Sequence, residues 1–228
     1  MNLKKKSKFN KIFSLKYFFY DFVKVTGVIP MYLFLRPRVK YINKQSCKHL
    51  RGGFILSANH QQFLDPIIMM FAFPFRRAFF IAMEKMFDTP LKTWFFNHMH
   101  CIKVDRNNVG IDTIRNASTA LQDEKLVCIF PEGKIGHDTD PETFKPGAAM
   151  MAMLNNVPIV PIYIEKRKSF WKSTKIIVGE PIVPKEVVGE TQSLKAIEKL
   201  NKYLYDKEHE LYKHYESLPG GKELAWKM

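Results

Sequence analysis

The sequence predicts an α/β fold in which helices cover both sides of a mostly parallel, mixed sheet. Short β-rich runs alternate with helical segments through most of the chain, an order typical of α/β proteins. A length of 228 residues, 46% of them hydrophobic, is enough for one large domain with a buried core. An N-terminal helical arm of different composition precedes this body.

Six runs have the composition of strands, and we expect the first to begin near Gly53. They are residues 53–58, 77–83, 101–106, 125–130, 157–164 and 174–180. Because no strand is predicted before Gly53, residues 1–35 are expected to be dispensable for folding of the body.

Five segments are predicted as helices, at residues 66–73, 90–99, 109–124, 146–156 and about 192–217. Asp65 and Pro66 are placed as N-cap and first residue of one helix, and Thr89 as the cap of another. Two helices are amphipathic, with inward faces predicted at Ile111, Ile114, Ala117 and Leu121, and at Leu194, Ile197, Leu200, Leu204 and Leu211.

The charge is concentrated at the N-terminus. Residues 1–51 hold thirteen Lys and Arg against one acid, a net charge of +12 out of +14 for the whole chain. A basic segment of this kind indicates an anionic partner, either a membrane or nucleic acid. We therefore divide the chain into a basic, aromatic-rich arm, residues 1–45, and a body, residues 46–228.

The arm favours a membrane surface over nucleic acid, because its aromatic residues are mixed with Ile, Leu, Val and Met. Its best apolar window, residues 25–35, is about 11 residues long, against about 20 for a spanning helix. No signal-peptide cleavage site follows. We expect an interfacial helix, or two broken near Gly27–Pro30, that inserts Phe13, Tyr17, Phe18, Phe19, Phe22 and Val23. A solvated tail leading to a core-packed helix is the alternative.

The sequence predicts no metal and no cofactor. The three cysteines match neither a zinc spacing nor a disulfide framework, which favours a reducing environment and hence the cytoplasmic face of a membrane. The cluster "HMHC" at residues 98–101 lacks the second ligand pair of a zinc site. Dinucleotide and P-loop motifs are missing from the sequence.

Polar residues gather where predicted strands end. In "SANHQQFLDP", His60 and Asp65 follow the first strand; Asp105 and Arg106 end the third, and Glu132 and Gly133 follow the fourth. The five-residue spacing of His60 and Asp65 is a weak signal alone. In open α/β sheets, however, ligand sites form beyond the carboxyl ends of strands, so these groups are expected to meet.

Four blocks occur in one order: N-H-x-x-x-x-D at 59–65, F-P-E-G at 130–133, "FKPGAAMMA" from residue 144, and "VPIVPI" from residue 157. Over about residues 52–182 the chain resembles the glycerolipid acyltransferase family, which includes the 1-acylglycerol-3-phosphate acyltransferases. The resemblance implies a membrane-associated O-acyltransferase without cofactors. Its donor would be an acyl-CoA or acyl carrier protein thioester. Its acceptor would be a lysophospholipid, above all 1-acylglycerol-3-phosphate, giving phosphatidic acid.

The residue types suit this chemistry. His60 is a general base for the acceptor hydroxyl, and Asp65 orients the imidazole and stabilises its charge. No G-x-S-x-G elbow supplies a protein nucleophile, so direct transfer is expected. The predicted substrate-binding residues are Asn59, Arg106, Glu132, Gly133 and Lys134, with the Arg106 guanidinium suited to phosphate.

The sequence departs from the family pattern after F-P-E-G, where Thr-Arg-Ser is the usual continuation. Here Lys134, Ile135 and Gly136 follow. The acceptor therefore stays open: glycerol-3-phosphate or another lysolipid is the alternative. An acyl-thioester hydrolase, or an inactive membrane-binding module, would also be compatible with these residues.

Overall fold

The computed structural model describes residues 15–105, 110–133, 135–136, 144–166 and 173–217. Its helices and strands are η1 (Leu15–Tyr17), α2 (Phe18–Leu35), β1 (Arg38–Tyr41), α3 (Lys44–Lys48), β2 (Phe54–Ala58), α4 (Asp65–Met70), β3 (Ala78–Met83), η2 (Glu84–Phe87), α5 (Pro90–His98), β4 (Ile102–Val104), α6 (Ile111–Gln122), β5 (Leu126–Ile129), α7 (Gly147–Asn155), β6 (Ile159–Ile164), β7 (Lys175–Val178), α8 (Pro184–Val188) and α9 (Leu194–Ser217).

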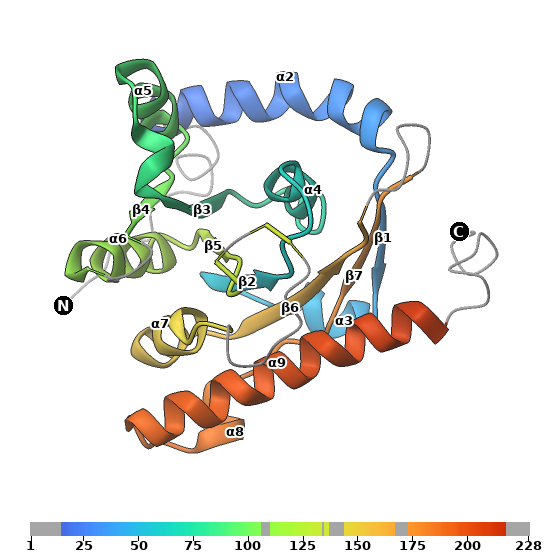
Figure 1. Cartoon of the computed structure of the whole chain (residues 1–228), viewed down its shortest axis with the longest axis vertical. Helices are drawn as coiled ribbons and strands as arrows, with labels where there is room; N and C mark the ends of the chain where they lie inside the picture. The colour runs from blue at the N-terminus through green and yellow to red at the C-terminus, as the bar shows by residue number, and fades with distance from the viewer. Residues whose placement is uncertain (1–14, 106–109, 134, 137–143, 167–172, 218–228) are drawn as a thin grey trace.

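The strands form one seven-stranded sheet in the order β1-β7-β6-β2-β5-β3-β4. All neighbouring pairs are parallel except β6 and β7, which are antiparallel. Helices lie on both faces of the sheet, with α4 on one side and α7 and α9 on the other (Figure 1). This confirms the predicted fold class: an α/β protein with a mostly parallel, mixed sheet.

The core has two layers, one on each face of the sheet. Successive residues of a strand point to opposite faces, so Ile55 packs with α6, α7 and α9, whereas Leu56 packs with α3 and α4. Both residues are fully buried. As β2 lies near the middle of the sheet, its carboxyl end is fixed by packing on both faces.

Each predicted strand and helix has a counterpart in the structure, but two details of the amphipathic faces were wrong. Ile111 is 75% exposed and Leu194 is 79% exposed, although both were predicted to point inward. Each is the first residue of its helix, α6 or α9. Burial begins two residues later, at Thr113 and Ala196, and the inward faces continue with Ala117 and Leu200, which are fully buried.

The expectation that the strands begin near Gly53 was also wrong. Residues 38–41, which fall within the predicted arm, form the edge strand β1 and pair with β7 in parallel register. The arm is thus continuous with the sheet. Only two residues separate β1 from α2, and the first of them, Arg36, ends the helix in a left-handed conformation.

The inner side of α2 packs against the body. Tyr20 is fully buried, and its hydroxyl both donates to the Ala78 carbonyl oxygen at 3.1 Å and accepts from the Ala78 N–H at 2.9 Å. Asp21 pairs with both Nε and Nη2 of Arg77, at 2.8 and 2.6 Å. Tyr17, predicted to enter lipid, is instead buried against Phe79. These contacts argue against a dispensable N-terminal segment.

The outer side of α2 is apolar and exposed. Its residues Phe18, Phe22, Val25, Ile29, Tyr32 and Leu33, together with Leu15 of η1, are each at least half exposed. In the described residues, no single helix is long and apolar enough to cross a bilayer; Leu15–Gly27 and Ile29–Leu35 pass only as a pair, bent by 42°. The bend lies near the break predicted at Gly27–Pro30. Pro30 has no N–H to donate to a carbonyl of the preceding turn, so the helix bends there. Phe13 lies outside the described residues.

Candidate active site

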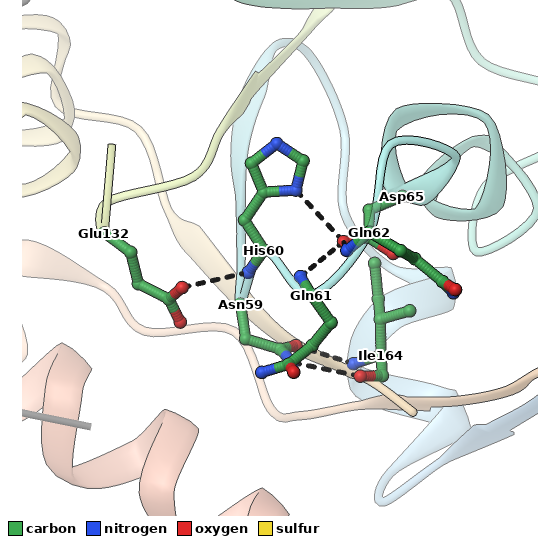
Figure 2. A network of polar contacts seen from close by, with 7 residues as sticks. All are labelled: Asn59, His60, Gln61, Gln62, Asp65, Glu132 and Ile164. Atoms are coloured by element: carbon green, nitrogen blue, oxygen red, sulfur yellow. Dashed lines mark hydrogen bonds and ion pairs between the residues drawn. The ribbon is translucent and has the colours of Figure 1, made fainter. Parts of the chain in front are cut away.

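The candidate site is the corner between β2 and α4. His60 follows β2, and Glu132 follows the adjacent parallel strand β5, so both lie at the carboxyl edge of the sheet. Figure 2 shows His60 between Glu132 on one side and Asp65 on the other. The strand order therefore brings together three of the residues that the sequence placed at strand ends.

His60 and Asp65 contact each other directly. His60 Nδ1 lies 3.0 Å from Asp65 Oδ2 (Figure 2). The same oxygen accepts from the N–H groups of Gln61 and Gln62, at 2.6 and 2.8 Å. Asp65 is fully buried, and the His60 side chain is 16% exposed. Oδ2 accepts hydrogen bonds from backbone N–H groups and lies beside Nδ1, so it can also accept one from a proton on Nδ1. In that tautomer the other ring nitrogen, Nε2, carries no proton and can act as a base.

The prediction that Asp65 is the N-cap of the following helix was wrong. The helix α4 begins at Asp65 itself, with Leu64 as its N-cap. The carboxylate instead accepts from the N–H groups of Gln61 and Gln62, so it closes the loop after His60. A carboxylate that holds both the loop and the ring fixes the histidine through its main chain and its side chain at once.

Three further contacts fix His60. Its ring stacks on Phe130 with centroids 4.2 Å apart. Its backbone N–H donates to Glu132 Oε2 at 3.3 Å, and its carbonyl oxygen accepts from the Gly136 N–H at 3.0 Å. Segments on either side of Gly133 therefore hold the main chain of His60. The Glu132 carboxylate, predicted to bind substrate, is thus hydrogen-bonded to the main chain of His60 in this arrangement.

Asn59 lies on the other side of His60 and faces the sheet. Its Nδ2 donates to the Ile164 carbonyl oxygen at 2.9 Å, and its Oδ1 accepts from the Ile164 N–H at 2.7 Å (Figure 2). Asn59 is only 8% exposed. The sequence placed Asn59 among substrate-binding residues, but the structure places its amide against the end of β6, away from the cavity. These two hydrogen bonds hold the residue before His60 against β6.

A cavity of about 1050 Å³ opens beside His60. Its walls are mainly apolar and come from α2, α4, β3, α5, α7 and the end of β5 with the segment after it; they include Met31, Ile67, Phe80, Phe96, Ile129 and Met150. Gly133 lines it with a φ of +65°, a conformation that favours glycine. Sites for small ligands have this character, an apolar hollow with few polar groups.

Two predicted substrate-binding residues, Arg106 and Lys134, lie outside the described residues. Asp105, the residue before Arg106, lines the cavity. Across the described part of the chain, no group of three or more His, Cys, Asp and Glu side chains is arranged to hold a metal ion. In the "HMHC" cluster, His98 Nδ1 lies 2.7 Å from the Trp94 carbonyl oxygen and His100 Nε2 3.2 Å from that of Lys16.

Glu208, from α9, is a residue near the site that sequence reasoning missed. Burial raises the pKa of Glu208 to about 8; the Ser57 hydroxyl lowers it and the nearby Glu132 carboxylate raises it further. An uncharged Glu208 near neutral pH avoids repulsion with Glu132. The signal was present: Glu208 occupies an inward position between Leu204 and Leu211 on an otherwise apolar helix face.

The chain matches one family model and several known proteins. The family model described as "Acyltransferase" matches residues 38–165. The 1-acyl-sn-glycerol-3-phosphate acyltransferase of Bacillus subtilis is 27% identical over 161 residues, 68% of this chain and 79% of that protein. The human 1-acyl-sn-glycerol-3-phosphate acyltransferase alpha is 32% identical over 124 residues, 52% of this chain and 42% of that protein.

The chain spans only about half the length of several relatives, including 53% of the Streptococcus pneumoniae 1-acyl-sn-glycerol-3-phosphate acyltransferase. Among solved structures, the 1-acyl-sn-glycerophosphate acyltransferase PlsC of Thermotoga maritima shares the fold, with a TM-score of 0.61 over 90% of this chain and 86% of that one. Its sequence identity is 22%, so this likeness concerns the fold alone. Because the family model covers more than half of its residues, the chain belongs to the acyltransferase family.

Proposed function

We propose that this chain is a membrane-associated O-acyltransferase that moves a fatty acyl group from an acyl thioester to the hydroxyl of a lysophospholipid. The observation that carries the proposal is the His60–Asp65 pair, 3.0 Å apart, opening onto an apolar cavity of about 1050 Å³. The acceptor proposed first is 1-acylglycerol-3-phosphate, the substrate in the names of the relatives from Bacillus subtilis and human. The product is then phosphatidic acid.

His60 acts as the general base of the transfer. Its Nε2 takes the proton of the acceptor hydroxyl as the oxygen attacks the thioester carbonyl carbon. The buried Asp65 carboxylate stabilises the imidazolium that forms. The tetrahedral intermediate collapses with cleavage of the C–S bond, and the imidazolium returns its proton to the departing thiolate. An ester and a free thiol result, and no acyl-enzyme is formed.

The cavity is suited to hold the acyl chain. Its walls are lined by Phe, Met, Ile and Val side chains, and methionine in particular adapts to chains of different shape. It begins at His60 and Phe130 and extends under α2 to Met31. A chain bound there keeps its carbonyl end beside the imidazole and excludes water from the reacting atoms.

The protein contacts the membrane through α2 and α5. The two helices pack together, with the Phe19 ring 4.9 Å from Trp94, and Figure 1 shows them at the same edge of the molecule. Exposed apolar residues on α5, Leu91 and Trp94, extend the exposed face of α2. A helix of this kind lies in the interface, with lysines of the arm near anionic headgroups on the cytoplasmic side.

Product analysis tests the proposed activity. The purified full-length protein is incubated with labelled acyl-CoA or acyl carrier protein thioester and with 1-acylglycerol-3-phosphate, other lysolipids, glycerol-3-phosphate or no acceptor. Phosphatidic acid is the expected product. Free fatty acid formed equally without acceptor would establish a hydrolase, and absence of any product with every pair would refute the proposal.

Vesicle binding tests the membrane contact. The protein is expected to bind vesicles containing phosphatidylglycerol more tightly than pure phosphatidylcholine vesicles, and less tightly as salt rises, because the arm is basic. Phe22→Ser should weaken binding to both about tenfold or more, the cost of losing one buried aromatic side chain. Equal binding to both vesicle types, unaffected by salt and by Phe22→Ser, would rule out this contact.

A further inference from the structure

Lys145 is joined to the loop that carries Glu132. It precedes α7 in the segment "FKPGAA", and its backbone N–H donates to the Pro131 carbonyl oxygen at 2.9 Å. Its side chain crosses the face of Gly133: a Cβ atom at Gly133 would lie 3.4 Å from Lys145 Cε and 3.7 Å from Nζ. The Lys145 side chain is thus held against the residue that follows Glu132.

This placement brings a cation into the half of the cavity that contains His60. Besides His60, the charged side chains that line the cavity within the described residues are Lys24, Asp105 and Lys145. Lys24 belongs to the α2 wall, where its Nζ donates to the Arg76 carbonyl oxygen at 2.5 Å. Lys145 instead contacts the loop that hydrogen-bonds the His60 main chain.

An anionic acceptor needs such a cation. A phosphate monoester carries about −1.5 to −2 charges near pH 7, and an apolar cavity strips it of water at a large cost unless a positive group is present. Asp105, on the same cavity, adds to that cost because its carboxylate repels an anion. A lysine forms the compact, strong contact with a single phosphate oxygen that such a site requires.

From this geometry, and resting on the proposed function, we propose that Lys145 binds the phosphate of the lysophospholipid acceptor and so selects acceptors that carry a phosphate monoester. His60 and Lys145 then contact the two polar ends of one acceptor: His60 the free hydroxyl and Lys145 the phosphate. Arg106 and Lys134, the cations expected from the sequence, lie outside the described residues.

The test compares Lys145→Met and Lys145→Gln with Lys145→Arg in the full-length protein. Lys195→Met, an exposed lysine on α9, is the matched control for loss of one positive charge. Both neutral variants are expected to raise the KM for 1-acylglycerol-3-phosphate by about 10- to 150-fold, with little change in the donor KM. Lys145→Arg should recover most of the affinity, and Lys195→Met should behave as wild type.

A binding measurement without donor separates this inference from the proposed activity. Neutral variants should lose affinity for 1-acylglycerol-3-phosphate but keep the affinity for monoacylglycerol of the same chain length, which lacks the phosphate. Equal losses for both lipids, or a rise confined to the donor KM, would overturn the role of Lys145. A wild-type protein that binds with this discrimination but transfers no acyl group would refute the proposed function alone.

Discussion

The corner that carries His60 and the helix α2 border the same cavity, but they are held in opposite ways. The corner is held by polar contacts: Asp65 accepts two backbone N–H groups, Glu132 accepts a third, and Asn59 binds Ile164. The helix is held mainly on its inner side, where Tyr20 is fully buried, and its outer side is exposed and apolar.

The difference matches two separate tasks, proton transfer at the corner and lipid contact at α2. A network of short hydrogen bonds holds reacting groups in one geometry, which is what proton transfer requires. An amphipathic helix offers a broad surface, which is what contact with lipid requires. Changes in the corner should therefore alter turnover, and changes on the inner side of α2 should alter stability.

The largest effect is expected from His60→Ala. General-base catalysis contributes about 10²- to 10⁴-fold, so kcat should fall by at least that range. The melting temperature should change little, because His60 lies in a loop and the backbone contacts to Glu132 and Gly136 do not require the ring. Steady-state kinetics and thermal unfolding check both parts. A variant that keeps more than a tenth of wild-type kcat would remove His60 from the mechanism.

Asp65→Asn is expected to lower kcat by about 10²- to 10⁴-fold. An Asn oxygen in the place of Oδ2 can still accept from the Gln61 and Gln62 N–H groups and face Nδ1, but it carries no negative charge to stabilise the imidazolium that forms. The helix should remain, since Asp65 is not its cap. Kinetics alongside circular dichroism measure both. Near-wild-type turnover would show that Asp65 serves only the loop.

Tyr20→Phe should lower the free energy of unfolding by about 1–3 kcal/mol, because the buried N–H and C=O of Ala78 both lose their partner. Turnover per folded molecule should be unchanged. Tyr32→Phe, at an exposed position of the same helix, is the control. Denaturant unfolding gives the values. Equal stability of both variants would show that the inner side of α2 is not part of the core.

The smallest effect concerns pH. Burial lowers the pKa of Lys24 to about 8, below its ordinary value of 10.5. Between these values the unfolded chain binds more protons than the folded one, so this lysine makes stability rise with pH. In Lys24→Met this rise should be missing. The free energy of unfolding of the wild type should therefore increase relative to that of the variant between pH 8 and 10. Denaturant unfolding across that range measures it; parallel curves would contradict a buried lysine.

The strand and helix pattern was largely predictable because the apolar runs are local signals. β1 was missed because a four-residue edge strand containing Arg38 and Lys40 has no apolar run, and its partner β7 lies far along the sequence. The first residues of α6 and α9, Ile111 and Leu194, were assigned inward because periodicity gives a direction but not where the helix meets the sheet.

The site was predictable in part. The pairing of His60 with Asp65 follows from residue type and spacing at a strand end. The partners of Asn59 and Glu132 did not follow, because Ile164 and the His60 N–H are backbone groups brought close only by the order of the strands. Lys145 was not predicted to bind substrate, because it lies twelve residues after Gly133 in the sequence and its side chain meets Gly133 only in the folded chain.

The pairing of β1 with β7 also orders events during synthesis. Arg38 pairs with Lys175, so 137 residues must be added after β1 before its partner exists. At about 5–20 residues per second this takes roughly 7 to 30 s. The strand β3, which the inner side of α2 packs on through Tyr20, is also made after α2; until β3 exists, α2 presents apolar side chains on both its sides to its surroundings. A nascent chain on the ribosome therefore has its greatest affinity for a lipid surface before the catalytic corner has been made.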